Sequence, residues 1–337
     1  MGLQYPQHEQ ADDDDAGDAD RPEYEAFSHD SAPFVVPKQP AGGMMVPFSA
    51  YVAVDWSGAT GRFHKGLAVA VAKPGAAAPL LVSPASPRGW ERGEVAQWLL
   101  AQPGRLLVGF DFSFAPPFVE RGAYLPGLDT PETGPAFWAW MDAQCTDAHL
   151  GAADFMAGAA RPHFWMGAAD GRKADFLHHR VCEVRYNAGG GGKASTVFDC
   201  VGAAQVAKAS FSGMRVLHRL RGHFAVWPFD AADDGRSVVV EIYTRAMLQL
   251  AGGRGAKVRD IAALDAALAE FESAGFGEGL GGMSPLSPGQ RALNDHETDV
   301  VVAAAGLRAL AGEARLWSPQ GMTAAIARTE GWTFGIR

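Results

Sequence analysis

The chain has 337 residues, of which 47% are hydrophobic, and carries a formal net charge of −9. This composition is typical of a globular protein, and the longest apolar runs are strand-length, well short of the about 18 residues of a membrane helix. We therefore expect no membrane-spanning segment. With no export signal and only three scattered cysteines, the sequence predicts a cytoplasmic protein with reduced thiols.

The negative charge is concentrated at the N-terminus. Residues 1–47 contain ten acidic and two basic residues, which leaves 27 basic and 28 acidic residues in 48–337. Such an acidic, apolar-poor segment cannot bury enough surface to fold, so we expect disorder over 1–47 and a nearly neutral folded domain over 48–337. A general nucleic-acid binder would be more basic.

Five apolar segments predict the strands of one sheet: 51–55, 65–73, 79–84, 105–114 and 236–246. Helical spacing and end signals predict helices over 91–102, about 257–272, and 294–312, with a Gly/Pro loop over 275–290 between the last two. This order indicates an α/β domain with a mixed sheet flanked by helices. Between the fourth and fifth strands lies a long insertion, 115–235, without one clear periodicity.

The insertion contains the stretch "YNAGGGGKAS" (186–195). Its glycines resemble a phosphate-binding loop, but it lacks the GxxxxGK[ST] spacing and no apolar strand leads into it. We therefore expect a loop without a nucleotide-binding role.

Three of the predicted strands end, or nearly end, in a carboxylate: Asp55, Asp111 and Glu241. The last predicted helix opens with further acids. Asp295 and Asp299 are four residues apart and share a helical face, with His296 beside them.

Several of these acids have a simpler explanation as well. Asp55 can be a turn residue. Glu241 can face solvent or pair with Arg245, and Asp295 can be the cap that starts its helix. Asp299 lies a turn further on, beside "VVVAAAG", where capping no longer explains it.

Buried carboxylates without matching lysines are costly unless they bind a cation. Hard cations such as Mg²⁺ and Mn²⁺ prefer oxygen ligands, and two of them about 4 Å apart can drive phosphodiester hydrolysis. The sequence therefore predicts a Mg²⁺ or Mn²⁺ site with the ligands Asp55, Asp111, Asp295, Asp299 and Glu241.

The segment 171–223 carries nine basic and three acidic residues. It is either a solvated face or a landing surface for a phosphate-bearing substrate such as nucleic acid. On the second interpretation, we expect substrate contacts from Arg180, Arg185, Lys193, Arg215 and Arg219, together with Ser57 in the turn after Asp55.

The motifs "VAVDWSG", "LLVGFDFSF", "VVVEIYTRA", "NDHETDVVVAAAGLRAL" and "EGWTFG" occur in that order over residues 49–335. Together they resemble a predicted nuclease family with an RNase H-like fold, the domain of unknown function 429. The resemblance implies a five-stranded mixed sheet flanked by helices, with Asp55 on the first strand and Asp111 on the fourth. It also implies that Asp299, with Asp295 or His296, completes the metal site, similar to RuvC-type resolvases.

The leading hypothesis is thus a divalent-metal-dependent nuclease in which Asp55, Asp111 and Asp299 are catalytic. His296, or a histidine from the 163–179 region, relays protons. Two alternatives stay open. "DWSGAT" (55–60) resembles the phosphate loop of actin-like phosphotransferases, and the chain can also be a non-catalytic binding protein that retains the fold. The sequence leaves open whether the substrate is DNA, RNA or a small phosphate compound, and leaves the oligomeric state open.

Overall fold

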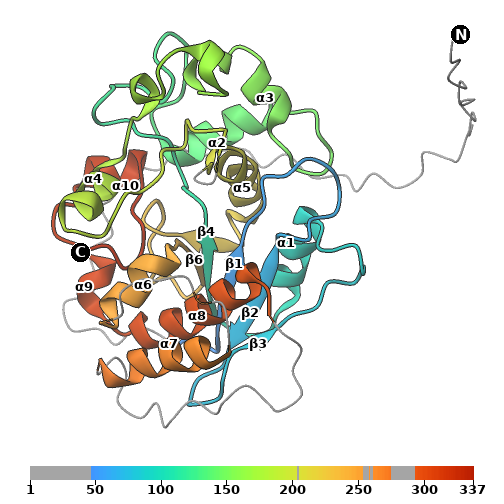
Figure 1. Ribbon diagram of the computed structural model, residues 1–337, viewed down its shortest axis with the longest axis vertical. Helices are drawn as coiled ribbons and strands as arrows, with labels where there is room; N and C mark the ends of the chain where they lie inside the picture. The colour runs from blue at the N-terminus through green and yellow to red at the C-terminus, as the bar shows by residue number, and fades with distance from the viewer. Residues whose placement is uncertain (1–46, 203–204, 253–257, 259–260, 275–292) are drawn as a thin grey trace, which may run out of the picture. The chain divides into compact units, whose positions relative to one another are not determined.

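A six-stranded mixed sheet forms the centre of the computed structural model, which describes residues 47–202, 205–252, 258, 261–274 and 293–337 (Figure 1). The strand order is β3-β2-β1-β4-β6-β5. Strands β1, β4, β6 and β5 are parallel to one another, whereas β2 pairs antiparallel with β1 and β3. Their bounds are β1 (Ala50–Asp55), β2 (Ala68–Ala72), β3 (Leu80–Leu81), β4 (Leu106–Asp111), β5 (Phe224–Val226) and β6 (Ser237–Glu241).

The α/β class and the mixed sheet agree with the sequence prediction, but the predicted number of five strands is wrong. All five predicted strands are present, and β5 adds a sixth at the sheet edge, within the segment 115–235. Three residues are too few to produce a recognisable alternation, so the sequence pattern missed this strand.

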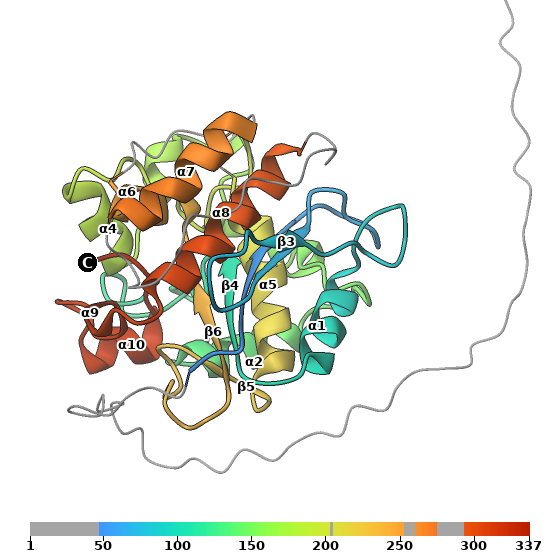
Figure 2. The same ribbon diagram turned by 90° about the horizontal axis from the view of Figure 1, so that it is seen from below.

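Helices cover both faces of the sheet (Figure 2). One face is covered by α1 (Arg92–Ala101), α2 (Gly134–Asp142) and α5 (Ala207–Leu220), and the other by α6 (Thr244–Leu250), α7 (Ile261–Ser273) and α8 (Asp295–Leu310). The remaining helices are α3 (Ala153–Ala157), α4 (Val181–Ala188), α9 (Ala314–Trp317), α10 (Ala324–Thr329) and the 3₁₀ turns Arg161–His163, Ala168–Asp170 and Lys173–Phe176.

Small side chains line the face of the sheet that packs on α8. They are Ala53, Ala68, Ala70, Ala72 and Gly109, opposite Ala303 to Ala305 of the helix. A Cβ atom at Gly109 would lie 2.7 Å from Ile242 and 2.9 Å from Leu307 of α8. Because the helix can approach so closely, its first turns lie beside the end of β1.

The opposite face is aromatic. Trp56, Phe110, Phe112 and Phe114 form a row of rings with successive centroids 5.3 to 5.7 Å apart. The indole of Trp56 also donates a 3.0 Å hydrogen bond to Ser212 of α5. Such ring pairs contribute about 0.5–1.5 kcal/mol each beyond their buried area, and this row ties the segments after β1 and β4 to α5.

The segment 115–235 contains several helices where the sequence showed no clear periodicity. In α5 the buried residues include the polar Ser210, Ser212 and Arg215 beside the apolar ones. Gly213 lets Phe112 approach, since a Cβ there would come within 2.4 Å of the ring.

Within the described ranges, none of the helices is long and apolar enough to cross a bilayer. Residues 1–46 of the predicted acidic segment and the whole of the predicted loop 275–290 lie outside the described residues. The terminal motif "EGWTFGIR" forms one parallel bridge, between Thr333 and Glu241, and the Phe334 amide donates to the Glu241 carbonyl at 2.8 Å. The end of the chain is thereby tied to the end of β6.

Candidate functional site: carboxylates at the ends of β1 and β4

Asp55 and Asp111 occupy paired positions at the ends of two neighbouring parallel strands. Their Cα atoms are direct partners in the β1–β4 register. Side chains alternate along a strand, and both Ala53, two residues before Asp55, and Leu107, four residues before Asp111, belong to the core on the α8 side. The two carboxylates therefore lie side by side and face the beginning of α8.

His296 reaches across from α8 to Asp55. Its Nδ1 lies 2.7 Å from Asp55 Oδ2, with the imidazole 48% exposed and the Asp55 side chain 16% exposed. The ring lies over Gly66, where an added Cβ would be 3.3 Å from Nε2. Two segments far apart in the sequence thus place an imidazole on a strand-end carboxylate.

The first turn of α8 is capped by Asn294 rather than by Asp295. The Asn294 side chain accepts a 3.0 Å hydrogen bond from the Glu297 amide, and Glu297 accepts one in return from the Asn294 amide. Asp295 is the first helical residue, so its alternative role as the helix cap is wrong. Asp299, one turn later, is half-buried.

The pKa of Asp111 is strongly perturbed. Burial, followed by the negative charges of Asp55, Asp299 and Glu241, raises its pKa well above the ordinary value. Asp111 makes no side-chain hydrogen bond or ion pair with any of the described residues. Its carboxyl therefore favours a proton or a cation at neutral pH. Asp295 is not among the charges that act on it.

Glu241 is engaged elsewhere, although its charge reaches Asp111. Its oxygens accept two hydrogen bonds from Arg180, at 2.7 and 2.5 Å, one from the Phe114 amide at 2.8 Å, and one from the Thr333 hydroxyl at 2.6 Å. Alternation explains this: Val240 belongs to the core on the α8 side, so Glu241 turns the other way. Four hydrogen bonds leave it poorly placed as a metal ligand.

Two of the arginines predicted to bind substrate are internal. Arg180 is 1% exposed and bonds to Glu183, Glu241 and the Glu330 carbonyl. Arg215 is 3% exposed and bonds to Asp142 and to the carbonyls of Asp147 and Gly151. Both side chains hold segments of the chain together.

The other predicted substrate contacts are spread out. Arg219 lies 3.7 Å from Asp142, and Arg185 donates to the Arg337 carbonyl. Lys193 is exposed on the glycine-rich loop. The structure therefore does not gather the five basic residues on one surface near Asp55.

Ser57 lies in the turn that follows Asp55, and this turn is fixed by Arg92. The buried Arg92 guanidinium donates to the Ser57 carbonyl at 3.0 and 2.9 Å and to the Ala59 carbonyl at 2.6 Å. On its other side Gly58 abuts α5, since a Cβ would fall 2.2 Å from the Ala209 amide nitrogen. Nothing in the sequence pattern marked Arg92 for this role.

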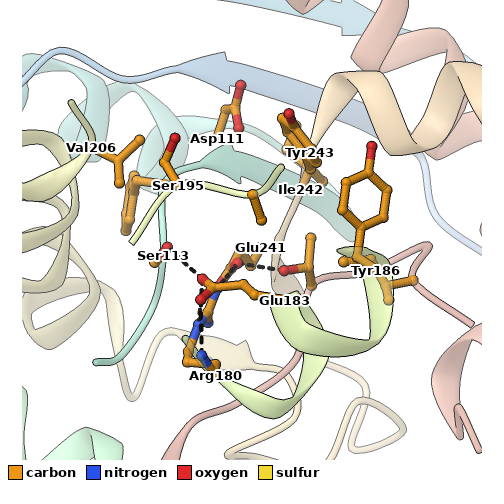
Figure 3. A pocket seen from close by; sticks show the side chains of 14 residues that line it. Asp111, Ser113, Arg180, Glu183, Tyr186, Ser195, Val206, Glu241, Ile242 and Tyr243 are labelled. Atoms are coloured by element: carbon orange, nitrogen blue, oxygen red, sulfur yellow. Dashed lines mark hydrogen bonds and ion pairs between the residues drawn. The ribbon is translucent and has the colours of Figure 1, made fainter. Parts of the chain in front are cut away.

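A pocket of about 100 Å³ opens beside Asp111 (Figure 3). Sequence reasoning missed most of its walls, including Ser195, Tyr186 and Tyr243. Tyr243 stands two residues after the strand-end Glu241, which was a usable signal. Glu183 follows Arg180 by three residues, a spacing at which opposite charges pair along a helix, so this ion pair could also have been predicted from the sequence.

The described residues contain no preassembled group of three or more His, Cys, Asp or Glu side chains arranged to hold a metal ion. The chain has no significant match among protein-family models, curated proteins or solved structures. The site itself is therefore the basis for any functional assignment.

Proposed function

We propose that the chain is a divalent-cation-dependent phosphodiesterase of the nuclease type, with Asp55 and Asp111 as its central carboxylates. The observation that carries this proposal is the state of Asp111. Its carboxyl lacks a hydrogen-bonding partner among the described residues and is surrounded by the negative charges of Asp55, Asp299 and Glu241. A bound cation would relieve that repulsion.

The donor chemistry fits Mg²⁺ or Mn²⁺. Mg²⁺ commonly keeps several waters and takes only one or two protein carboxylates, with substrate phosphate oxygens completing its shell. The paired Asp55 and Asp111 match this pattern, and the half-buried Asp299 supplies a third oxygen donor nearby. A preassembled cage of three ligands is not required.

A cation held here would supply charge stabilisation for the phosphate and activation of a water molecule. The protein's own groups have separate tasks. Asp55 holds His296 through the Nδ1–Oδ2 contact, which orients the imidazole at the strand ends. His296 is the proposed general acid or base, which takes or returns a proton in the reaction. Asp111 and Asp299 provide the negative field that retains the cation.

The architecture supports an RNase H-like assignment. The five predicted strands belong to a mixed sheet with helices on both faces, and Asp55 and Asp111 lie on the first and fourth strands, as the family resemblance implies. Such fold-level transfer is analogy, and it lends less weight to the activity than Asp111 does.

The phosphotransferase alternative has less support. A phosphate loop needs backbone amides that a phosphate can approach, but Gly58 is packed against the α5 backbone and the carbonyls of Ser57 and Ala59 accept from Arg92. The turn is therefore already filled by protein.

Hydrolysis of single-stranded, hybrid and branched nucleic acids, and of bis(p-nitrophenyl) phosphate, with Mg²⁺ or Mn²⁺ tests the proposal. We expect cation-dependent cleavage that falls by at least about 100-fold in Asp55→Asn and Asp111→Asn. Asp129→Asn is the matched control because Asp129 is exposed and outside the site. Cleavage that survives both site variants would refute the assignment, and absence of cleavage would favour the non-catalytic alternative.

A further inference from the structure

The polar side chains at the floor of the pocket beside Asp111 are paired with one another, whereas those at its rim are not. At the floor, Arg180 joins Glu183 and Glu241 in a buried network (Figure 3). At the rim lie Asp111 and Ser195, and neither side chain makes a hydrogen bond with another described residue. The rim therefore offers hydrogen-bonding groups to an occupant, whereas the floor does not.

The side walls are aromatic. Tyr186 and Tyr243 both line the pocket and pack edge to face, with centroids 5.4 Å apart. A space of about 100 Å³ holds several waters, because one water needs about 10–15 Å³. Apolar walls with a few polar groups at one end fit a small ring that carries hydroxyls.

The charge of the lining disfavours a phosphate inside the pocket. Three carboxylates, those of Asp111, Glu183 and Glu241, face one guanidinium, that of Arg180. A neutral hydroxyl can instead donate to a carboxylate, as ribose hydroxyls do to acidic side chains in dinucleotide-binding proteins. A phosphate would thus stay at the mouth, beside Asp55 and Asp111, with its sugar inside.

The basic segment 171–223 is poorly equipped to hold a long polynucleotide. Proteins that grip duplexes neutralise many phosphates with lysine and arginine. Here the basic side chains of 171–223 have carboxylate or carbonyl partners in most cases: Lys173, Arg172, Arg180, Arg185, Arg215, Arg219 and Arg221. Binding through a pocket requires no such surface.

The geometry points to a small phosphodiester, no larger than a dinucleotide, as the substrate, with one of its sugars bound in the pocket between Ser195 and Asp111. This inference rests on the proposed phosphodiesterase function for its chemistry. The substrate class, a small phosphodiester, is inferred from the size and lining of the pocket.

Ser195→Trp tests the pocket, because an indole at the rim would occupy it. Ser83→Trp is the matched control, since Ser83 is exposed and lies outside the pocket. The first readout is calorimetric binding of a nucleoside 5′-monophosphate with Mn²⁺. We expect Ser195→Trp to weaken binding at least tenfold and Ser83→Trp to leave it unchanged. Equal binding by wild type and Ser195→Trp, or no binding by wild type, would overturn the inference.

The second readout is the ratio of kcat/KM for a dinucleoside monophosphate to that for bis(p-nitrophenyl) phosphate, which has no sugar. We expect a ratio of at least ten, and its loss in Ser195→Trp. Faster cleavage of long strands with a steep salt dependence would overturn the inference while leaving the phosphodiesterase proposal intact. Pocket-dependent binding without hydrolysis would support the subsite and refute the proposed function.

Discussion

His296 and Asp55 are 241 residues apart in the sequence and meet at 2.7 Å, with Nδ1 of the imidazole on Oδ2 of the carboxylate. This contact gives α8 a chemical as well as a packing role, because it presents an ionisable ring to the strand ends. We expect His296→Gln to lower kcat by about 10²–10⁴-fold, the usual range for loss of a general acid or base. Steady-state kinetics with saturating Mn²⁺ would measure this, and an unchanged kcat would exclude the proton-relay role.

The position of the imidazole depends on Gly66. A Cβ there would lie 3.3 Å from Nε2, so the bulkier Gly66→Val should displace the ring from Asp55. We expect activity to approach that of His296→Gln while the melting temperature changes by only a few degrees. Gly93→Val is the control, because a Cβ at Gly93 meets no atom within 4 Å. Equal activity in both variants would show that the ring is not positioned by Gly66.

Asp111 should lower the stability of the fold at neutral pH. Its pKa is raised in the folded state, so the folded protein binds the proton more tightly than the unfolded chain does. The resulting contribution to stability is complete at acidic pH and is lost as pH rises through the folded pKa. Asp111→Asn removes this loss, and each unit of pKa shift corresponds to about 1.4 kcal/mol. Denaturant unfolding should therefore show a stabilised variant whose advantage over wild type grows with increasing pH. An advantage that stays constant with pH would contradict a raised pKa at this position.

The same position allows a cation test that is independent of turnover. Mn²⁺ at about 100 times its dissociation constant would stabilise wild type by about 2.7 kcal/mol. Asp111→Asn should lose most of this thermal shift, and the exposed Asp129→Asn should retain it. Equal shifts in the two variants would place the cation elsewhere.

Removal of Arg180 should be strongly destabilising. Its loss leaves Glu183 and Glu241 buried without a counter-charge, and breaking one partner of a buried pair typically costs about 3–5 kcal/mol. Arg180→Met can be compared with Arg172→Met, whose ion pair with Asp175 is exposed and contributes at most about 1 kcal/mol. Urea unfolding of both variants measures the difference, and similar losses would contradict a buried network.

His64 should make the fold sensitive to acid. Burial, followed by the positive charge of Arg92, lowers its pKa to about 4. The unfolded chain takes up the proton near pH 6.5 but the folded chain does not, so the contribution of His64 is complete above pH 6.5 and is lost as pH falls toward 4. His64→Gln should flatten the stability curve in that window, as measured by thermal unfolding from about pH 4 to 7. An unchanged slope would assign the acid sensitivity to other groups.

The sheet and its strand-end acids were predictable from the sequence because both depend on local pattern. Apolar runs indicated β1 and β4, and two parallel strands bring their carboxyl ends to one edge, which is why Asp55 and Asp111 are neighbours. The long Ala/Val pattern likewise predicted α8 and placed Asp299 beyond its cap.

The partners of the charged side chains could not be predicted from the sequence. Arg180 and Arg215 were assigned to a phosphate-binding surface because composition shows charge but not burial. Glu241 looked like a third strand-end ligand, but a shift of one residue along a strand turns the side chain to the other face of the sheet. Its partner Arg180 also comes from another segment of the chain. The pocket, which is assembled from several segments, left no trace in any one of them.

The small side chains beneath α8 link core packing to the chemistry of the site, because they set the position of the helix. Because Gly109 and Ala53 let the helix pack closely against the sheet, we expect one added methyl group at this contact to move α8 outward. His296 would then move away from Asp55, and Asp299 away from Asp111. Substitutions in the core, which alter no acid and no proton-transferring group, could thereby retune cation affinity. Selection for activity would then keep these positions small, although their side chains do not contact the substrate.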